Sequence, residues 1–292
     1  MMEIFQHSEL ILNTDGSVYH LHLLPHQIAH LIITVGDPER VETVSKHFDV
    51  IEHSLKKREF ITQTGRIGSK NITVISTGIG TDNIDIVLNE LHLLANYDFE
   101  KQEWKENFTK LTFIRIGTSG SIQPDIPVDS FLLSEYAIGI DNMLNFYNFK
   151  NSSQEIEMLE KFKMHAYFPS TIHPYITSAS SNLLSLFDDT FLKGITLTAP
   201  GFYAPQGRKI NTTLKMDKFY DDVRTFHYGK HRITNIEMET AGLYGLARVL
   251  GHEAISCNAL LANRSNGMFS SQPYVTVGKM TEKIFDQVLN KL

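Results

Sequence analysis

Short apolar runs that end in glycine recur along this chain, and they constrain its fold more than any other feature. The runs AHLIITVG, NITVISTG and LTFIRIG end at Gly36, Gly78 and Gly117. Runs of this length with many β-branched residues are typical of buried strands. Helical patterns follow the first two, and a fourth apolar run, ending near Asn263, is preceded by another helical pattern. This alternation predicts an α/β fold with a mostly parallel or mixed sheet covered by helices.

Nothing in the sequence divides the chain. It shows no internal repeat, and the polar segments 99–110 and 148–157 are too short to be domain linkers. We therefore expect residues 1–292 to form a single domain, with residues 1–17 as an N-terminal extension.

The carboxyl ends of the four strands are expected to share one rim, where open α/β sheets bind ligands. At this rim we expect Asp37 to act as the N-cap of a helix over residues 37–48. We also expect Gly117–Gly120 to form a turn that brings backbone N–H groups toward an anion.

Composition and charge exclude several classes of protein. The net charge of −6 and the pI near 6.1 give no general attraction to nucleic acid or to anionic lipid, so an anion site must be local. A single cysteine, Cys257, excludes an intramolecular disulfide framework and is consistent with a reducing compartment. Because no signal peptide and no apolar run of about 20 residues is present, we expect a cytoplasmic protein that binds neither membranes nor nucleic acid.

Arg115 lies inside an otherwise apolar strand, directly before Gly, Thr and Ser residues. Buried arginines are rare unless they are paired. One interpretation is a structural ion pair with a carboxylate such as Glu239. The other is an anion clamp, since the guanidinium fork matches phosphate oxygens, with Thr118 and Ser119 supplying hydroxyl groups.

Two further segments carry candidate binding groups. Glu237 and Glu239 are two residues apart, so both point to one side of an extended segment and could hold a sugar diol or an arginine. The loop GFYAPQGRKI places Gln206 and Arg208 beside aromatic Phe202, a combination suited to a planar base. The chain lacks the dinucleotide, P-loop, nucleophile-elbow and zinc-protease motifs.

Taken together, these segments resemble the nucleoside phosphorylase family, and most closely its uridine phosphorylase branch. The motifs VGDPERV, REF, STGIG, RIGTSGSIQP, FYAPQGR, NIEMET and LLANR occur in the family's order, over nearly the whole chain. FYAPQGR and LLANR resemble the uridine branch specifically. The resemblance implies a single-domain α/β fold with a central mixed, partly barrel-like sheet flanked by helices. It also implies the reversible phosphorolysis of uridine, or of related pyrimidine nucleosides, with inorganic phosphate as co-substrate and no required cofactor.

Roles for individual residues follow from the resemblance. The implied phosphate-binding residues are Gly36, Arg40, Arg58, Arg115 and Thr118. The implied ribose-binding residues are His20, Met238 and Glu239, and the implied base-binding residues are Phe202, Gln206, Arg208 and Arg264. Ser119, Gly120 and Glu237 are implied as supporting residues.

The resemblance also implies an assembly. His20 and Arg58 resemble residues that reach the active site of the neighbouring subunit, so a homo-oligomer is expected, either a dimer or a hexamer built from dimers. Some members bind potassium between subunits, and Glu59 resembles the glutamate that they use, although Asn83 replaces the accompanying serine.

Three rival functions remain at this stage. A purine nucleoside phosphorylase is disfavoured because Asn263-Arg264 replaces the aspartate that protonates the purine in that branch. A nucleosidase would leave the arginines without a purpose. A non-catalytic nucleoside-binding protein would bind uridine without turning it over.

Overall fold

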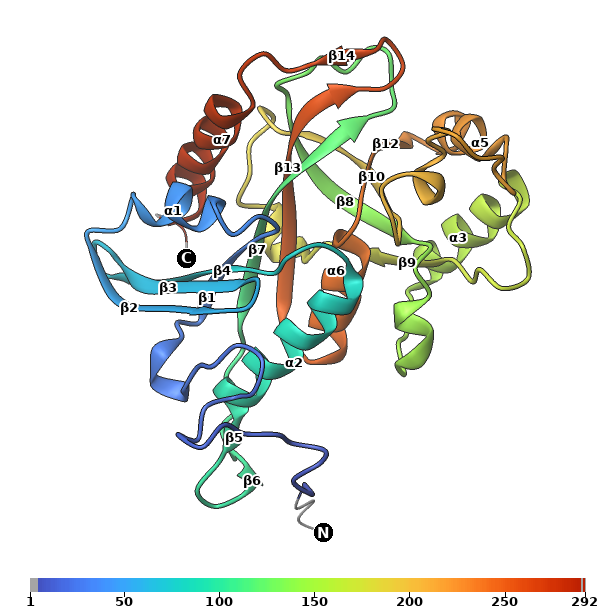
Figure 1. Ribbon diagram of the computed structural model, residues 1–292. Helices are drawn as coiled ribbons and strands as arrows, with labels where there is room; N and C mark the ends of the chain where they lie inside the picture. The colour runs from blue at the N-terminus through green and yellow to red at the C-terminus, as the bar shows by residue number, and fades with distance from the viewer. Residues whose placement is uncertain (1–4, 290, 292) are drawn as a thin grey trace.

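The computed structural model describes residues 5–289 and 291, and one large mixed sheet organises them (Figure 1). Its strands follow the order β11-β12-β10-β8-β13-β7-β1-β4-β3-β2, with β14 beside β13 and β9 beside β8. The strands are β1 Leu31–Val35, β2 Val50–Lys57, β3 Phe60–Ile67, β4 Lys70–Ser76, β7 Thr112–Ser121, β8 Phe131–Gly139, β9 Tyr175–Ser178, β10 Leu192–Thr198, β11 His227–Tyr228, β12 His231–Glu237, β13 Glu253–Asn263 and β14 Met268–Phe269.

Part of the sheet closes on itself. The end of β7 pairs with β12 in antiparallel fashion, with Ser121 opposite Asn235 and Gly120 opposite Ile236. This contact closes the ring β7-β13-β8-β10-β12 into a five-stranded barrel, while β1 to β4 continue the sheet outward from β7. The expected α/β fold with a mixed, partly barrel-like sheet is therefore confirmed.

Helices cover the sheet, and three clusters of apolar side chains lie between the helices and the strands. One cluster lies under α2 and α6, a second under α1, α4 and α7, and a third under α3 and α5 beside the barrel (Figure 1). The helices are α1 Arg40–Ser45, α2 Thr81–Asn96, α3 Ser153–His165, α4 Ser181–Leu184, α5 Phe219–Thr225, α6 Thr240–Val249 and α7 Pro273–Val288, with 3₁₀ turns η1 Pro25–Gln27, η2 Met143–Phe146 and η3 Ala204–Gln206. Among the described residues, none of these helices has the length and apolar content that spanning a membrane requires.

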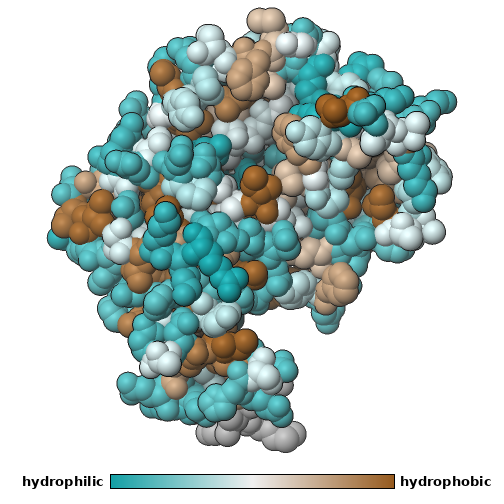
Figure 2. Space-filling view, in the orientation of Figure 1, coloured by the Kyte–Doolittle hydropathy of each residue, from teal (hydrophilic) through white to brown (hydrophobic). Residues whose placement is uncertain are grey.

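The surface seen in Figure 2 is mainly hydrophilic, with apolar residues scattered in small separate patches. Isolated apolar side chains of this kind are normal on folded proteins.

The alternation of side chains along β7 determines to which side of the sheet Arg115 points. Ile114 and Ile116 pack into the cluster under α1 and α7, and Phe113 packs on the other side under α2 and α6. Because successive side chains of a strand point to opposite faces, Arg115 shares the side of Phe113. The side chain is therefore directed away from α1 and α7, toward the barrel.

Two local predictions at the rim are wrong. The first helix begins at Arg40, and Asp37 does not cap it, because its side chain closes a preceding turn by accepting a hydrogen bond from Glu39 N at 3.0 Å. Gly117–Gly120 is not a turn but part of β7, which continues to Ser121 because β13 and β12 pair with it there. Gly251, the second residue after α6, has φ of +79°, the left-handed conformation that commonly ends a helix.

The segment after α2 packs near two histidines in contact, the half-buried His92 of α2 and the buried His252. Strands β5 Tyr97–Asp98 and β6 Glu103–Trp104 form a small hairpin. Beneath this segment, His252 Nε2 lies 3.0 Å from His92 Nδ1, and Leu111 N donates to His252 Nδ1 at 3.2 Å. The ring of Phe108 stacks on His252. These contacts require His252 to be neutral, since its Nδ1 acts as an acceptor.

This pair predicts acid sensitivity of the fold. Burial, and then the neighbouring His92 and Lys110, lower the pKa of His252 to about 3. The unfolded chain takes up this proton near pH 6.5, so the free energy of unfolding should fall as the pH drops from about 7 to 4. In urea titrations, His252→Asn should lose less stability over this range than the wild type, because the amide does not titrate. The same replacement at exposed His30 is the control, and equal slopes for the wild type and His252→Asn would contradict the interpretation.

Candidate active site

A cavity of about 730 Å³ opens at the rim where β1, β4, β7 and β12 end. It unites most of the residues that the sequence singled out. Those that line it are Gly36, Arg40, Glu59, Arg115, Thr118, Ser119, Gly120, Phe202, Gln206, Arg208, Glu237, Met238 and Glu239. Arg58, His20 and Arg264 are not among the lining residues.

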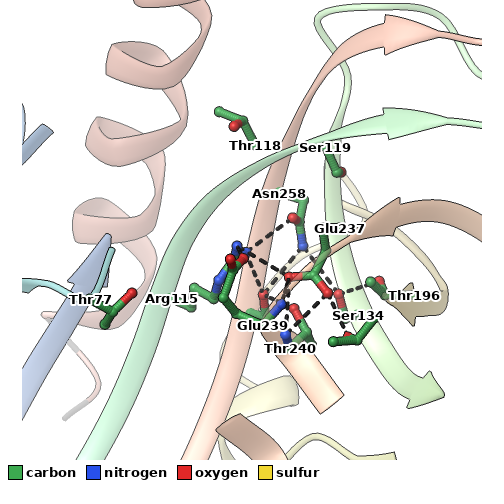
Figure 3. Close-up of polar contacts among 12 residues, drawn as sticks. Thr77, Arg115, Thr118, Ser119, Ser134, Thr196, Glu237, Glu239, Thr240 and Asn258 are labelled. Atoms are coloured by element: carbon green, nitrogen blue, oxygen red, sulfur yellow. Dashed lines mark hydrogen bonds and ion pairs between the residues drawn. The ribbon is translucent and has the colours of Figure 1, made fainter. Parts of the chain in front are cut away.

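Arg115 is one of three buried charged residues in the cavity wall, with Glu237 and Glu239, and 4% of its surface is exposed. Its Nη2 pairs with Glu239 Oε2 and lies 3.2 Å from Glu237 Oε2 (Figure 3). Nη1 faces Asn258 Oδ1 at 3.3 Å and Ser256 Oγ at 3.4 Å. Arg115 therefore forms the predicted ion pair with Glu239, and it also lines the cavity.

Gly117 makes this geometry sterically feasible. A Cβ at this position would lie 1.8 Å from Arg115 Nη1 and 2.6 Å from Cζ. The guanidinium thus crosses over the bare backbone two residues further along the strand. Only glycine leaves room for that path.

Two carboxylates and one guanidinium share this buried volume, and their charges do not cancel. Burial raises the pKa of Glu239, and the like charge of Glu237 adds to this effect against the opposing pull of Arg115. Burial acts to lower the pKa of Arg115, but Glu237 and Glu239 outweigh it and raise the pKa. Arg115 is therefore always charged, and the site gains from a further cation or a shared proton.

The two carboxylates are held by different parts of the fold. Glu237 lies at the N-terminus of α6, where it accepts from the backbone N–H groups of Glu239 and Thr240 and from Thr198 Oγ1 at 2.6 Å. The positive end of a helix favours an anion there. Glu239 accepts from Gly80 N at 2.9 Å, which ties it to the loop after β4.

Arg40 approaches the cavity from the other side of β7. It is the first residue of α1, and its Nη2 donates to Thr118 Oγ1 at 3.2 Å. Burial lowers the pKa of Arg40, and Asp37 opposes this shift. Arg40, Arg115 and Thr118 thus converge on one end of the cavity, which we call the anion end.

Gln206, Arg208 and Phe202 form a second group on the cavity wall. Gln206 is 2% exposed, and its Oε1 accepts from Arg208 Nη1. Arg208 also donates to Phe202 O at 2.7 Å and covers the Phe202 ring at 3.9 Å. Burial, and then Arg264, lower the pKa of Arg208 to about 10. This group offers an amide, a donor fork and an aromatic ring, and we call it the base end.

Arg264 contacts the base end from behind. Its Nη1 donates to the backbone oxygen of Gln206 at 2.7 Å, and its guanidinium lies over the Tyr220 ring at 4.3 Å. The structure therefore places Arg264 as a brace for the Gln206 loop, whereas the sequence predicted a direct contact with the base.

His20 and Arg58 lie together outside the cavity. His20 Nδ1 is 2.6 Å from Glu90 Oε1 of α2, and its ring packs edge-on against Tyr19. Arg58 lies over the same Tyr19 ring at 5.7 Å, on the turn between β2 and β3. Neither residue completes the cavity of its own chain.

Glu59 and Asn83 lie side by side at the rim. A Cβ at Gly78 would meet Asn83 Nδ2 at 2.5 Å and Glu59 Cγ at 3.2 Å. Their two side chains offer three oxygen atoms, fewer than a potassium site needs, so further ligands would have to come from elsewhere. No group of three metal-ligating His, Cys, Asp or Glu side chains occurs within the part of the chain that the structure describes.

Sequence reasoning missed the polar residues beneath Arg115. Ser256 and Asn258 come from β13, which is otherwise apolar, and both contact the guanidinium. Their alternation in EAISCNALL places them on one face of the strand, opposite Cys257. Polar residues at every second position of a buried strand were the available signal.

Comparison with known proteins identifies the class. A model of the phosphorylase superfamily matches residues 30–286, so the chain belongs to that superfamily. Within it, the chain is similar to proteins named uridine phosphorylase. It is 29% identical to that of Thermococcus kodakarensis over 92% of this chain and 86% of the relative, and 28% identical to that of Haemophilus influenzae over 94% and 96%.

A solved structure shares the fold closely. It is the Trypanosoma brucei nucleoside phosphorylase, described as showing uridine phosphorylase activity, with 28% identity and a TM-score of 0.86 over 96% of this chain and 99% of that one. A purine nucleoside phosphorylase of Listeria monocytogenes is also similar, at 25% identity over 81% of this chain and 83% of the relative.

The clearance at Gly117 generates a prediction for anion binding. Gly117→Ala should displace the Arg115 guanidinium from Glu239 and Asn258, and should weaken phosphate binding roughly 10- to 100-fold, as expected for lost hydrogen bonds to a charged group. Calorimetric titration with phosphate measures this. Gly278→Ala in α7, where a Cβ has open space, is the matched control. Unchanged phosphate affinity in Gly117→Ala would show that Arg115 does not hold the anion.

Proposed function

We propose that this protein catalyses the reversible phosphorolysis of uridine to uracil and ribose 1-phosphate, as a pentosyl-transferring glycosyltransferase. The observation that carries the proposal is that one cavity is lined by the anion end, by the base end, and by Met238 and Glu239. A nucleoside phosphorylase needs separate groups for phosphate and base around the sugar, because phosphate must attack the sugar carbon from the side away from the base. The uridine phosphorylases among its relatives support the choice of base.

In this proposal the anion end positions the nucleophile. Arg115 and Arg40 carry the charge that phosphate needs, and Thr118 adds a hydroxyl group next to Arg40. Gly36, directly after β1, brings its backbone close to the Gly78 carbonyl, 3.4 Å from where a Cβ would lie. Phosphate held here captures a sugar that develops oxocarbenium character as its bond to the base breaks.

Glu239 and Met238 then hold the ribose between the two ends. The Glu239 carboxylate can accept from a sugar hydroxyl while it remains paired with Arg115. Glu237 fixes the start of α6, and so fixes where Glu239 stands. Glu239 would therefore bind the sugar in a position that its ion pair with Arg115, the phosphate-binding arginine, helps to set.

The base end stabilises the leaving group. As the glycosidic bond breaks, negative charge grows on uracil, and Arg208 and Gln206 provide a cation and an amide nearby. A preorganised donor of this kind is typically worth about 3 kcal/mol of transition-state stabilisation. No redox cofactor takes part, and potassium at Glu59 is proposed only as a structural aid between subunits.

The base end also favours a pyrimidine over a purine. The pair Asn263-Arg264, near the point where the purine branch carries its aspartate, contains no carboxylate. Of the two, Asn263 is buried and donates to Gln123 O at 2.8 Å and Ile126 O at 2.7 Å. It is therefore committed to the fold and does not reach the base. Phe202, Gln206 and Arg208 provide no carboxylate that could protonate a purine.

We further propose a homo-oligomer in the cytoplasm, with active sites completed across the subunit interface. Arg58 and His20 form a surface cluster with Tyr19 that lies outside the cavity of their own chain. In the assembly, Arg58 would reach the neighbouring phosphate and His20 the neighbouring sugar. Either a dimer or a hexamer of dimers provides this contact.

Arg40→Ala tests the phosphate role while Arg115 stays in place to pair with the buried carboxylates. Replacing Arg115 would leave Glu237 and Glu239 unpaired, which costs about 3–5 kcal/mol of stability, whereas Arg40 acts on Glu239 only at longer range. We expect phosphorolysis of uridine, followed by absorbance, to fall by about 10²–10³. Arg66→Ala, at an exposed ion pair with Glu52, is the control. Uracil release that does not depend on phosphate would instead identify a nucleosidase, and cleavage of inosine but not uridine a purine enzyme.

Dilution tests the shared site. If Arg58 and His20 act across an interface, specific activity should fall as the protein dissociates, in parallel with the mass measured by light scattering. Full activity in a monomer would refute that assignment. Mixing inactive Arg58→Ala with inactive Arg40→Ala subunits should restore part of the activity, because each mixed dimer contains one intact site.

A further inference from the structure

The cavity presents more negative than positive charge to an anion that enters it. Four acidic side chains and three arginines line it, which gives a net charge of −1. These residues are Asp37, Glu59, Glu237, Glu239, Arg40, Arg115 and Arg208. Adding Arg58 from a neighbouring subunit, as in the proposed assembly, brings the net charge only to zero. A dianion such as phosphate therefore enters a site with no surplus of positive charge.

The positive charge of Arg115 is already shared between two carboxylates. Its Nη2 pairs with Glu239 Oε2 and lies 3.2 Å from Glu237 Oε2 (Figure 3). Its Nη1 donates to Ser256 Oγ and Asn258 Oδ1. An added anion gains most from this guanidinium if one of the two carboxylates loses its charge.

Glu237 is the less suitable of the two carboxylates to take a proton. It accepts hydrogen bonds from Glu239 N, Thr240 N and Thr198 Oγ1. It also lies at the positive end of α6, which favours an anion. A proton on this carboxyl group would occupy an oxygen lone pair that these donors use.

The other two acidic residues of the cavity wall are in contact with solvent. Glu59 is exposed, and Asp37 is half-buried and accepts from Glu39 N at 3.0 Å. Water and salt screen charges at such positions. An anion inside the cavity therefore affects Asp37 and Glu59 less than it affects a buried carboxylate.

Glu239 has the surroundings that favour a proton. It is 5% exposed, and among the described residues its side chain accepts hydrogen bonds only from Gly80 N and Arg115. Burial raises the pKa of Glu239, and Glu237 adds to this effect, whereas Arg115 and the Gly80 N–H group oppose it. The carboxyl group is therefore closer to protonation than a solvated glutamate.

The anion end lies beside this carboxyl group. Arg115 contacts Glu239 directly, and Arg40 interacts with both Arg115 and Glu239 at longer range. An anion held by Arg40 and Arg115 thus adds negative charge next to Glu239. A like charge at short range disfavours the ionised form of a carboxyl group.

We infer that anion binding at the anion end is coupled to the uptake of one proton, which Glu239 takes from the solvent and holds while the anion is bound. The carboxylate and a proton from the buffer combine to a carboxylic acid, and no covalent bond to the anion forms. The inference rests on the proposed function for the identity of the anion as phosphate.

Protonation changes what the site offers. A neutral Glu239 leaves the charge of Arg115 to the anion, with Glu237 as its remaining counter-ion. The carboxylic acid also provides an O–H donor where the free protein has only an acceptor, and its other oxygen still accepts from a sugar hydroxyl group.

Calorimetry in buffers with different ionisation enthalpies counts the protons taken up. Sulfate is the probe, because it remains a dianion near neutral pH and cannot carry the proton itself, whereas phosphate can. Between pH 5 and 8 the uptake by the wild type should approach one proton per sulfate, and the sulfate affinity should then fall about tenfold per pH unit. Sulfate binding without proton uptake throughout this range would overturn the inference.

Glu239→Gln locates the proton. Glutamine matches glutamic acid in size and carries no charge, so this variant should bind sulfate without proton uptake and with an affinity nearly independent of pH. Glu59→Gln removes an exposed carboxylate from the same cavity wall and is the matched control, which should keep the wild-type uptake. Uptake that persists in Glu239→Gln, or that is lost in Glu59→Gln, would overturn the assignment to Glu239.

Infrared difference spectra of the wild type give a measurement that does not depend on a variant. They are recorded with sulfate and with phosphate, so that they remain decisive if only phosphate binds. Anion binding should produce the C=O band of a carboxylic acid and remove intensity from the carboxylate bands. Bound anion without this new band would overturn the inference.

These tests separate the inference from the proposed function, because anion binding needs no turnover. Proton uptake without phosphate-dependent release of uracil would refute the proposed function and leave the inference standing. Phosphorolysis without proton uptake on anion binding would do the reverse. A protein that binds neither sulfate nor phosphate would refute both.

Discussion

The contact of Arg115 with Glu237 and Glu239 is the interaction on which the rest of the site depends. It joins β7, the end of β12 and the start of α6, and its surroundings add β13 through Ser256 and Asn258. Breaking such a pair by removing one partner is costly, since the other charge stays buried. The fold therefore holds in place the guanidinium that would meet the phosphate.

The geometry around this contact explains several features that otherwise look unrelated. Gly117 leaves the space through which the guanidinium passes. Gly80 donates to Glu239 from the loop after β4, and Glu237 stabilises the N-terminus of α6. Each of these residues either clears a path for the charges or provides hydrogen bonds that keep them buried.

The sequence allowed the fold class and most of the cavity wall to be predicted, because strands that end in glycine and motifs in a fixed order are local signals. The pairing of β7 with β12 depends on residues more than a hundred positions apart, so Gly117–Gly120 was expected to be a turn and is a strand. Arg264 was expected at the base, but the nearby Tyr220 ring and Gln206 carbonyl engage it, and both contacts depend on tertiary structure. Ser256 and Asn258 were not predicted, because polar residues at alternate positions of a buried strand indicate that a buried partner exists but do not identify Arg115 as that partner.

The closure of the barrel has a consequence for how the protein can change. The anion end is built from strands and from the starts of helices α1 and α6, whereas Phe202, Gln206 and Arg208 lie on the segment between β10 and β12, outside the closed ring. Substitutions in that segment change the base end and leave the strands of the closed ring, which hold Arg115, unchanged. A scaffold divided in this way can acquire a new preference for the leaving group while the machinery for the attacking group is inherited intact.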